Sequence, residues 1–209
     1  MERRDFIKIS GAGALALGAV ATGCTPKKTA SSTEEGPEQM VYRENPVSGD
    51  KVSLIGFGCM RWPMVKDASG KDVIDQEAVN EMVDYAIEHG INYFDTSPAY
   101  LQGQSEMAAG IALSRHPRDK YFIATKLSNF GDNSPEGSLR MYQESFRQLK
   151  TDYFDYYLLH SIGRGGVEAF RKRYVENGML DFLLKEKEAG RIRNLGFSFH
   201  GKAEEIDSL

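Results

Sequence analysis

INYFDTSPAY, residues 91–100, is a short apolar run that ends in Asp95 and continues into a loop carrying Tyr100. YFIATK, residues 121–126, and FDYYLLH, residues 154–160, have the same form and end in Lys126 and His160. Each run is rich in aromatic and β-branched residues and precedes a stretch with helical periodicity, which is typical of βα units. The sequence therefore predicts an α/β protein with a parallel sheet and right-handed crossovers.

The predicted units follow one another along most of the chain. We expect a hairpin across 41–54, strands at 55–59, 91–95, 121–126, 154–160 and 192–197, and helices at 75–88 and 105–115, from 134 onward, in two parts around 177–178, and from 203. A doubly wound sheet is the alternative, but Gly56-Phe57-Gly58 lacks the third glycine of a dinucleotide fingerprint. The pattern favours a (β/α)8 TIM barrel, with about five of its eight units present.

Four polar side chains follow the ends of these predicted strands. In a (β/α)8 barrel the C-terminal strand ends gather at one face, and neighbouring strands lie roughly 4.8 Å apart. Asp95, Tyr100, Lys126 and His160 would therefore converge on one small site. Taken singly, each has a structural explanation as a turn, loop, strand-end or core residue. Together, an acid, a phenol, an amine and an imidazole form a set suited to proton transfer.

Composition and charge exclude several classes of protein. The chain has 209 residues, a formal net charge of −4 and no basic block beyond its first residues, so nucleic acid is not an expected partner. No stretch of about 20 strongly apolar residues indicates a membrane-spanning helix. The two cysteines, Cys24 and Cys59, lack the spacing of a metal site, and we predict neither a metal site nor a structural disulfide.

The first 40 residues have the composition of an export signal and a tether. Residues 1–23 combine Arg3-Arg4, a Gly/Ala/Leu-rich middle and Ala21-Thr22-Gly23. They resemble a twin-arginine signal that ends in a bacterial lipobox, with Cys24 as the lipidated residue. Residues 24–40 are rich in Thr, Ser, Pro, Lys and Glu, which is typical of a flexible tether. We therefore expect an exported protein, periplasmic or in the cell envelope, held on a membrane by lipid.

Five segments of residues 51–201 resemble the aldo/keto reductase family in the family's order. They are IGFGCM, GINYFDTSPAY with GQSE, ATK, DYYLLH and GRIRNLGFS. The resemblance implies a (β/α)8 barrel, with 41–209 as its N-terminal part, that binds NADP(H) or NAD(H) and transfers hydride between the nicotinamide and a small carbonyl or alcohol. GCMRWP and GFSFHG look closest to a bacterial branch with a C-terminal ferredoxin-like domain.

The resemblance also implies roles for the four polar residues. Tyr100 would be the general acid, because the oxyanion left by hydride addition to a carbonyl needs a proton. Lys126 would stabilise the tyrosine phenolate by its charge, and Asp95 would pair with Lys126. His160 would hydrogen-bond the carbonyl oxygen and orient the substrate.

The same resemblance places five residues near the cofactor. Gly58, Cys59 and Met60 match a segment beside the nicotinamide ribose, Asp95 is shared with the catalytic set, and Ser198 matches a residue that holds the carboxamide. Phe199 stands where many members carry asparagine, so the resemblance does not extend to the second half of that contact.

Because a barrel needs eight units and about 250 residues, we expect the chain to be the N-terminal part of a longer protein. The remaining units would carry much of the adenosine and 2′-phosphate site and the cysteines of any 4Fe-4S cluster. Since reduced nicotinamide is not expected outside the cytoplasm, turnover there would require a redox partner. Two alternatives are a non-catalytic barrel that binds a nucleotide or small ligand, and a hydrolase that uses Asp95 with Glu106, a residue that helix capping otherwise explains.

Overall fold

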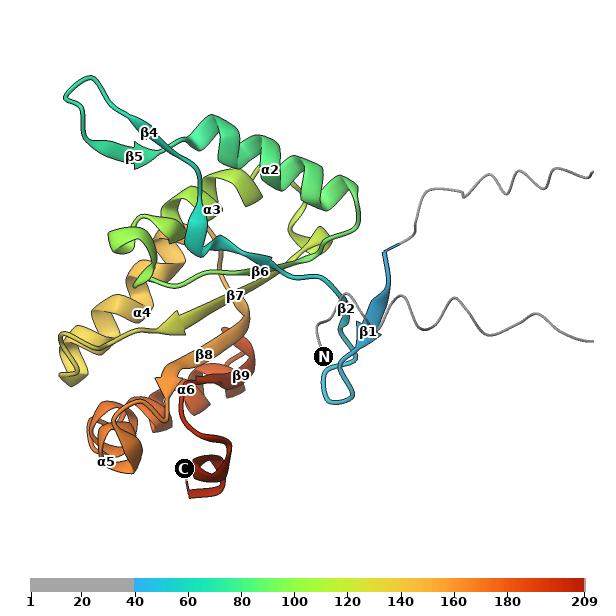
Figure 1. Cartoon of the computed structure of the whole chain (residues 1–209). Helices are drawn as coiled ribbons and strands as arrows, with labels where there is room; N and C mark the ends of the chain where they lie inside the picture. Colours follow the sequence, from blue (N-terminus) through green and yellow to red (C-terminus); the bar gives the residue numbers. More distant parts are fainter. Residues whose placement is uncertain (1–39, 209) are drawn as a thin grey trace, which may run out of the picture. The chain divides into compact units, whose positions relative to one another are not determined.

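The computed structural model describes residues 40–208. Five strands form one parallel sheet in the order β3, β6, β7, β8, β9 (Figure 1). Their bounds are Phe57–Gly58, Tyr93–Asp95, Phe122–Leu127, Phe154–Ile162 and Ile192–Phe199. Strand order follows chain order without the reversal of a doubly wound sheet, as a barrel requires. The expected signal and the lipidation at Cys24 fall within 1–39, outside the described residues, as does the tether expected over 24–40 except for Met40. These expectations and the wider domain division stay predictions.

Helices connect successive strands and pack on one another in chain order. They are α2 (Gln76–Glu88), α3 (Ser105–Leu113), α4 (Pro135–Leu149), α5 (Gly166–Phe170) and α6 (Met179–Glu188). Helix α2 packs on α3, α3 on α4, and α4 on α6 (Figure 1). Asp75 caps α2 by accepting from the Ala78 N–H, and Ser134 caps α4 by accepting from the Gly137 N–H, with Pro135 at the first position.

Most predicted elements are present, with shifts at their ends. The first strand, expected over 55–59, pairs only over Phe57–Gly58, because β3 lies at an edge and has β6 as its partner. Helix α3 ends at Leu113 instead of 115, and the final helix is a 3-10 segment, Ala203–Ser208. One hairpin was missed: β4 (Met64–Lys66) pairs with β5 (Asp72–Ile74) across a turn in which Asp67 accepts from the N–H groups of Ser69 and Lys71.

An aromatic layer joins the helices to the sheet. Tyr142 of α4 packs edge-on against Phe154 and Tyr157 of β8, with ring centroids 6.1 and 5.2 Å apart. Phe146 stacks on Phe154 at 4.1 Å, and Phe182 of α6 meets Tyr142 at 5.2 Å. Phe154 and Tyr157 are completely buried, and aromatic pairs of this kind are worth about 0.5–1.5 kcal/mol beyond their area. This layer fixes α4 and α6 against β8.

The N-terminal hairpin contacts the sheet at the start of its strands. It comprises β1 (Tyr42–Glu44) and β2 (Lys51–Ser53), as the sequence predicted. Asp50, in its turn, accepts hydrogen bonds from the Tyr156 hydroxyl at 2.9 Å and from Asn194 Nδ2 at 3.1 Å. Tyr156 and Asn194 are paired in register on β8 and β9. The hairpin therefore lies near the N-terminal strand ends, away from the ends that carry Lys126 and His160.

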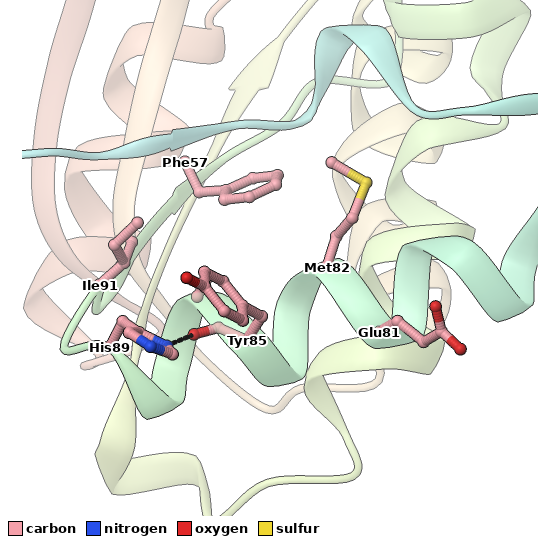
Figure 2. Close-up of a pocket in the computed structure, with 7 residues that line it drawn as sticks. Phe57, Glu81, Met82, Tyr85, His89 and Ile91 are labelled. Carbon is pink, nitrogen blue, oxygen red and sulfur yellow. Dashed lines mark hydrogen bonds between the residues drawn. The ribbon is translucent and has the colours of Figure 1, made fainter.

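A mainly apolar pocket lies between α2 and the edge strand β3. It is lined by Phe57, Glu81, Met82, Tyr85, Ala86, His89 and Ile91. Figure 2 shows Phe57 facing the α2 side chains of Tyr85 and Met82. Tyr85 is 65% exposed, and the His89 ring stacks on it with centroids 3.9 Å apart. None of the four predicted catalytic side chains lines this pocket. Separately, no helix within residues 40–208 combines the length and apolar character that crossing a bilayer requires.

Close packing of α3 on α4 depends on Gly110. A Cβ at this position would press on the carbonyl oxygen of Gln148 and lie 2.8 Å from Cα of Leu149, and neither backbone atom can move aside cheaply. We predict that Gly110→Ala lowers the free energy of unfolding by about 2 kcal/mol or more. Gly131→Ala is the matched control, since a Cβ there meets no atom within 4 Å. Denaturant titration of both variants measures the difference, and equal stabilities would refute the packing argument.

Candidate active site

The strand register places the predicted polar residues on one face of the sheet. Asp95 pairs with Ala124, two residues before Lys126 on β7. Lys126 pairs with Leu158, two residues before His160 on β8, and Leu158 pairs with Gly196, two residues before Ser198. Because side chains alternate between faces along a strand, steps of two keep all of these groups on the same face. From β6 to β8 each strand carries its polar group two residues further along the sheet, whereas Ser198 on β9 lies level with His160.

Lys126 and Asp95 form an ion pair at the centre of this row. Lys126 Nζ donates to Asp95 Oδ1 at 2.5 Å and to the Thr96 carbonyl oxygen at 2.8 Å. Lys126 is 3% exposed, so its ammonium group has little access to water. A buried charge is tolerated only when it is paired and hydrogen-bonded, and both partners come from β6 or the residue directly after it. The ion pair therefore fixes the ammonium position from the neighbouring strand.

Tyr100 lies over this ammonium group. It begins a 3-10 segment, Tyr100–Gly103, and its N–H donates to the Ser97 carbonyl oxygen at 3.0 Å. Leu101 and Gln102 in the same segment have positive φ, a costly conformation that marks a sharply turned loop. Lys126 Nζ lies 4.8 Å from the Tyr100 ring centroid, and the rings of Tyr100 and His160 are 5.8 Å apart. The structure thus brings the phenol, the amine, the acid and the imidazole together.

His160 is held by two serine hydroxyls. Its Nδ1 lies 2.5 Å from Ser128 Oγ and 3.3 Å from Ser97 Oγ. Burial, reinforced by the charges of Lys126 and Arg173 and by His200, lowers the pKa of His160 to about 4. The imidazole is therefore neutral at pH 7 and has one nitrogen free to accept and one N–H to donate.

A backbone irregularity follows His160 directly. Ser161 has φ of +56°, and the β8–β9 register shifts between Leu159 and Ile162. The Ser161 N–H donates to Ser198 Oγ at 2.7 Å, which stabilises this conformation from β9. Bulges and strained residues of this kind occur next to active sites, where they redirect side chains. Ser198, expected at the cofactor, therefore has a structural contact as well.

A buried arginine that was not among the predicted site residues lies behind His160. Arg173 lies in a π-helical turn, Arg171–Val175, and is 8% exposed. Its Nη2 donates to the His160 carbonyl oxygen at 2.9 Å, and its Nε donates to Asn129 Oδ1 at 3.1 Å. The guanidinium lies over the Phe130 ring at 4.4 Å, and Phe130 in turn lies 5.0 Å from the His160 ring. The π-helical turn, a feature that often marks a functional site, would have pointed to Arg173, but the spacing of residues in the sequence does not reveal such a turn.

Gly58, Cys59 and Met60, at the end of β3, differ in how far they are exposed toward the site. Gly58 pairs with Asp95 in register, and a Cβ on it would meet no atom within 4 Å. Met60 is 47% exposed. Cys59 is completely buried, its carbonyl oxygen accepts from Ser105 Oγ at 2.7 Å, and burial raises the pKa of its thiol. Of these, Gly58 and Met60 are accessible, whereas the Cys59 side chain is part of the core.

Glu106 lies against the opposite face of the sheet and does not cap α3. Its carboxyl accepts from Thr125 Oγ1 at 2.5 Å and from Ser145 Oγ at 3.1 Å, and it is completely buried. Burial raises its pKa to about 7. Thr125 alternates with Lys126 along β7, so Glu106 and Asp95 are separated by the sheet. The capping explanation is therefore wrong, and the paired-carboxylate alternative has no geometry to support it. Among residues 40–208, no three His, Cys, Asp or Glu side chains are arranged to hold a metal ion.

Comparison with known proteins gives the family. The sequence profile of the aldo/keto reductase family matches residues 54–209. The chain belongs to the aldo/keto reductase family. It is 30% identical over 158 residues to "Probable aldo-keto reductase 1" of Glycine max, a match that covers 69% of this chain and 44% of that protein. The chain spans about half the length of the curated relatives it matches.

Solved aldo/keto reductases share the fold. The holo form of AKR11C1 from Bacillus halodurans superposes with a TM-score of 0.59 at 28% identity, covering 77% of this chain and 51% of that one. An aldo/keto reductase from Klebsiella pneumoniae in complex with NADP and acetate gives a TM-score of 0.57 at 27% identity, covering 77% and 50%. The five-stranded sheet is thus an incomplete (β/α)8 barrel, as the sequence predicted.

The depressed pKa of His160 has a consequence for stability. The folded state holds this imidazole neutral down to about pH 4, whereas in the unfolded state the histidine has its ordinary pKa near 6.5. Below pH 6.5 the unfolded state therefore binds more protons than the folded state. We predict that the free energy of unfolding falls by about 3 kcal/mol from this group as the pH drops from 6.5 to 4. The component should be absent in His160→Gln. NMR titration of the His160 ring gives a direct check, and a midpoint near 6.5 would contradict it.

Proposed function

We propose that this protein is an NAD(P)-dependent oxidoreductase that interconverts a carbonyl and an alcohol, with Tyr100 as general acid and base. The observation that carries the proposal is the position of the Tyr100 ring 4.8 Å from the buried ammonium of Lys126, which is itself paired with Asp95. A phenol becomes a useful proton donor when a fixed cation stabilises the phenolate it leaves. Family membership supports the same chemistry.

The proton balance follows from these groups. As hydride adds to the carbonyl carbon, negative charge develops on the carbonyl oxygen, and the Tyr100 hydroxyl gives it a proton. The phenolate that remains is stabilised by Lys126 until a proton from solvent restores it. Oxidation of an alcohol reverses each transfer, with the phenolate as base. Asp95 acts through Lys126, because its Oδ1 accepts a hydrogen bond from the Lys126 ammonium at 2.5 Å and fixes the position of that group.

His160 orients the substrate in this proposal. Since the imidazole is neutral at pH 7, it can donate one hydrogen bond to the carbonyl oxygen without adding a positive charge that would compete with Lys126 for the phenolate. The ring centroids of His160 and Tyr100 are 5.8 Å apart, so both side chains are close enough to contact one substrate group. Two hydrogen-bond donors to the carbonyl oxygen would stabilise the negative charge that develops on it in the transition state.

The residues present fit a nicotinamide dinucleotide. The open backbone of Gly58 beside Asp95 leaves room for a flat ring, and Met60 is accessible next to it. Ser198 Oγ accepts from the Ser161 N–H and keeps its own proton for a carboxamide oxygen. Phe199 packs against Gly163 and offers no polar group, so the asparagine contact of the family has no equivalent there. When bound, the nicotinamide supplies or accepts the hydride.

The cofactor and substrate are proposed at the level of class. NADP(H) is favoured over NAD(H) because a related reductase is solved in complex with NADP. The substrate is a small carbonyl compound or alcohol. A 4Fe-4S cluster, a redox partner and a lipid anchor at Cys24 remain proposals from sequence alone.

Tyr100→Phe tests the proposed chemistry. Removing the hydroxyl leaves no proton donor at the position from which Tyr100 would protonate the carbonyl oxygen. We therefore predict that kcat for reduction of a panel of aldehydes by NADPH falls by ~10²–10⁴-fold. NADPH binding, followed by fluorescence, should stay near the value of the unmodified protein, since the ring remains. The measurement uses the full-length protein.

Tyr85→Phe is the matched control, because Tyr85 is exposed on α2 and lies outside the site. It should leave kcat unchanged. Full activity in Tyr100→Phe would overturn the assignment of the acid. Tight NADPH binding by an unmodified protein that reduces no member of the panel would favour the non-catalytic binding barrel instead.

A further inference from the structure

We infer that the hydroxyls of Ser97 and Ser128 hold the imidazole of His160 in the tautomer that carries its proton on Nε2; the catalytic use of that proton rests on the proposed function. The two serines follow β6 and β7, and His160 lies on β8, so the contact joins three neighbouring strand ends. Ser97 and Ser128 act through His160 and are positioning residues.

The three side chains form a closed set of hydrogen bonds. Ser97 Oγ lies 2.8 Å from Ser128 Oγ, and Ser128 Oγ lies 2.5 Å from His160 Nδ1. Ser97 Oγ is also 3.3 Å from Nδ1 and accepts the Ala99 N–H at 3.1 Å. Ser97, Ser128 and His160 are all buried. Because these side chains have little access to water, we expect each hydroxyl proton to have its acceptor within this set.

With the proton on Nε2, every donor has a partner. The Ala99 N–H donates to Ser97 Oγ, the Ser97 hydroxyl donates to Ser128 Oγ, and the Ser128 hydroxyl donates to the bare Nδ1 of His160. Both hydroxyl protons are used, and Nδ1 accepts one bond. The chain of donors runs in one direction, from the loop backbone to the imidazole.

With the proton on Nδ1, the set has more hydrogen-bond donors than acceptors can satisfy. The ring N–H would donate to Ser128 Oγ or Ser97 Oγ, and the two hydroxyls could then share only one bond between them. One hydroxyl proton would have no acceptor among the described residues, since neither hydroxyl has a bond outside the set other than the Ala99 N–H. A buried donor without a partner destabilises the state that contains it. We expect this cost to select the Nε2 tautomer by about fivefold or more.

The selected tautomer directs an N–H away from the serines. Nε2 makes no hydrogen bond to any residue of the described range, and it is not an enclosed unpartnered atom. Burial and the charges of Lys126 and Arg173, with His200, disfavour a second proton on the ring, and the Tyr100 phenol is the other titratable group that contacts it. A neutral donor on this side of the ring is what the proposed orientation of a carbonyl oxygen requires.

Nitrogen-15 NMR of the histidine rings in the full-length protein at pH 7 tests the inference. In the unmodified protein we expect Nδ1 of His160 to resonate as a bare nitrogen and Nε2 as a protonated one. In Ser128→Ala, where only the 3.3 Å contact to Ser97 remains, we expect a mixture of tautomers, and in the double variant with Ser97→Ala a larger share of Nδ1–H. His160 protonated on Nδ1 in the unmodified protein would overturn the inference, as would an unchanged tautomer in both variants.

Ser145→Ala is the matched control, because Ser145 is equally buried but bonds to Glu106 on the other face of the sheet. It should leave the His160 tautomer unchanged. Where aldehyde reduction is measurable, Ser128→Ala should lower kcat about tenfold with little change in KM, as expected for a bond made in the transition state. The NMR result stands without turnover, so failure of the tautomer assignment can be told apart from failure of the proposed reduction.

Discussion

A buried ion pair between two neighbouring strands is the constraint on which the site depends. The Lys126 ammonium has almost no contact with water, so Asp95 and the Thr96 carbonyl must satisfy it, and both lie at the end of β6. This arrangement requires β6 and β7 to be parallel neighbours in the observed register. The Tyr100 loop then follows β6 directly, which places its phenol over the same ammonium group.

The proposed catalytic residues lie on one face of the sheet, and the packing against the helices lies on the other. One face carries Asp95, Lys126 and His160. Lys126 lies two residues past the residue that pairs with Asp95, and His160 lies two residues past the residue that pairs with Lys126. The other face carries the aromatic layer under α4 and the buried carboxyl of Glu106. Acidic groups on the second face are kept from the first by the sheet itself. At the strand ends of the first face, the titratable groups are therefore one carboxylate paired with one ammonium, one neutral imidazole and the Tyr100 phenol.

The residues at the strand ends could be predicted because short apolar runs rich in aromatic and β-branched residues, each followed by a stretch with helical periodicity, are local signals. Asp95, Lys126 and His160 were found this way, and their convergence followed from the geometry of parallel strands. What the sequence could not indicate were contacts across large separations, such as Ser128 against His160 and Arg173 behind it. The burial of Glu106 was missed for the same reason, since tertiary packing decides it. The β4–β5 hairpin is local, but its strands are only three residues long and its turn depends on Asp67 accepting from nearby backbone N–H groups.

The most direct test of this site is a single-turnover measurement with Lys126→Met in the full-length protein. Oxidation of bound NADPH on mixing with an aldehyde would be followed by stopped flow, beside NADPH affinity from fluorescence. Methionine keeps the length of the side chain and removes its charge. If the ammonium serves Tyr100, the transfer slows by at least ~10²-fold while NADPH affinity changes little. A transfer rate equal to that of the unmodified protein would show that the ion pair has no part in the chemistry.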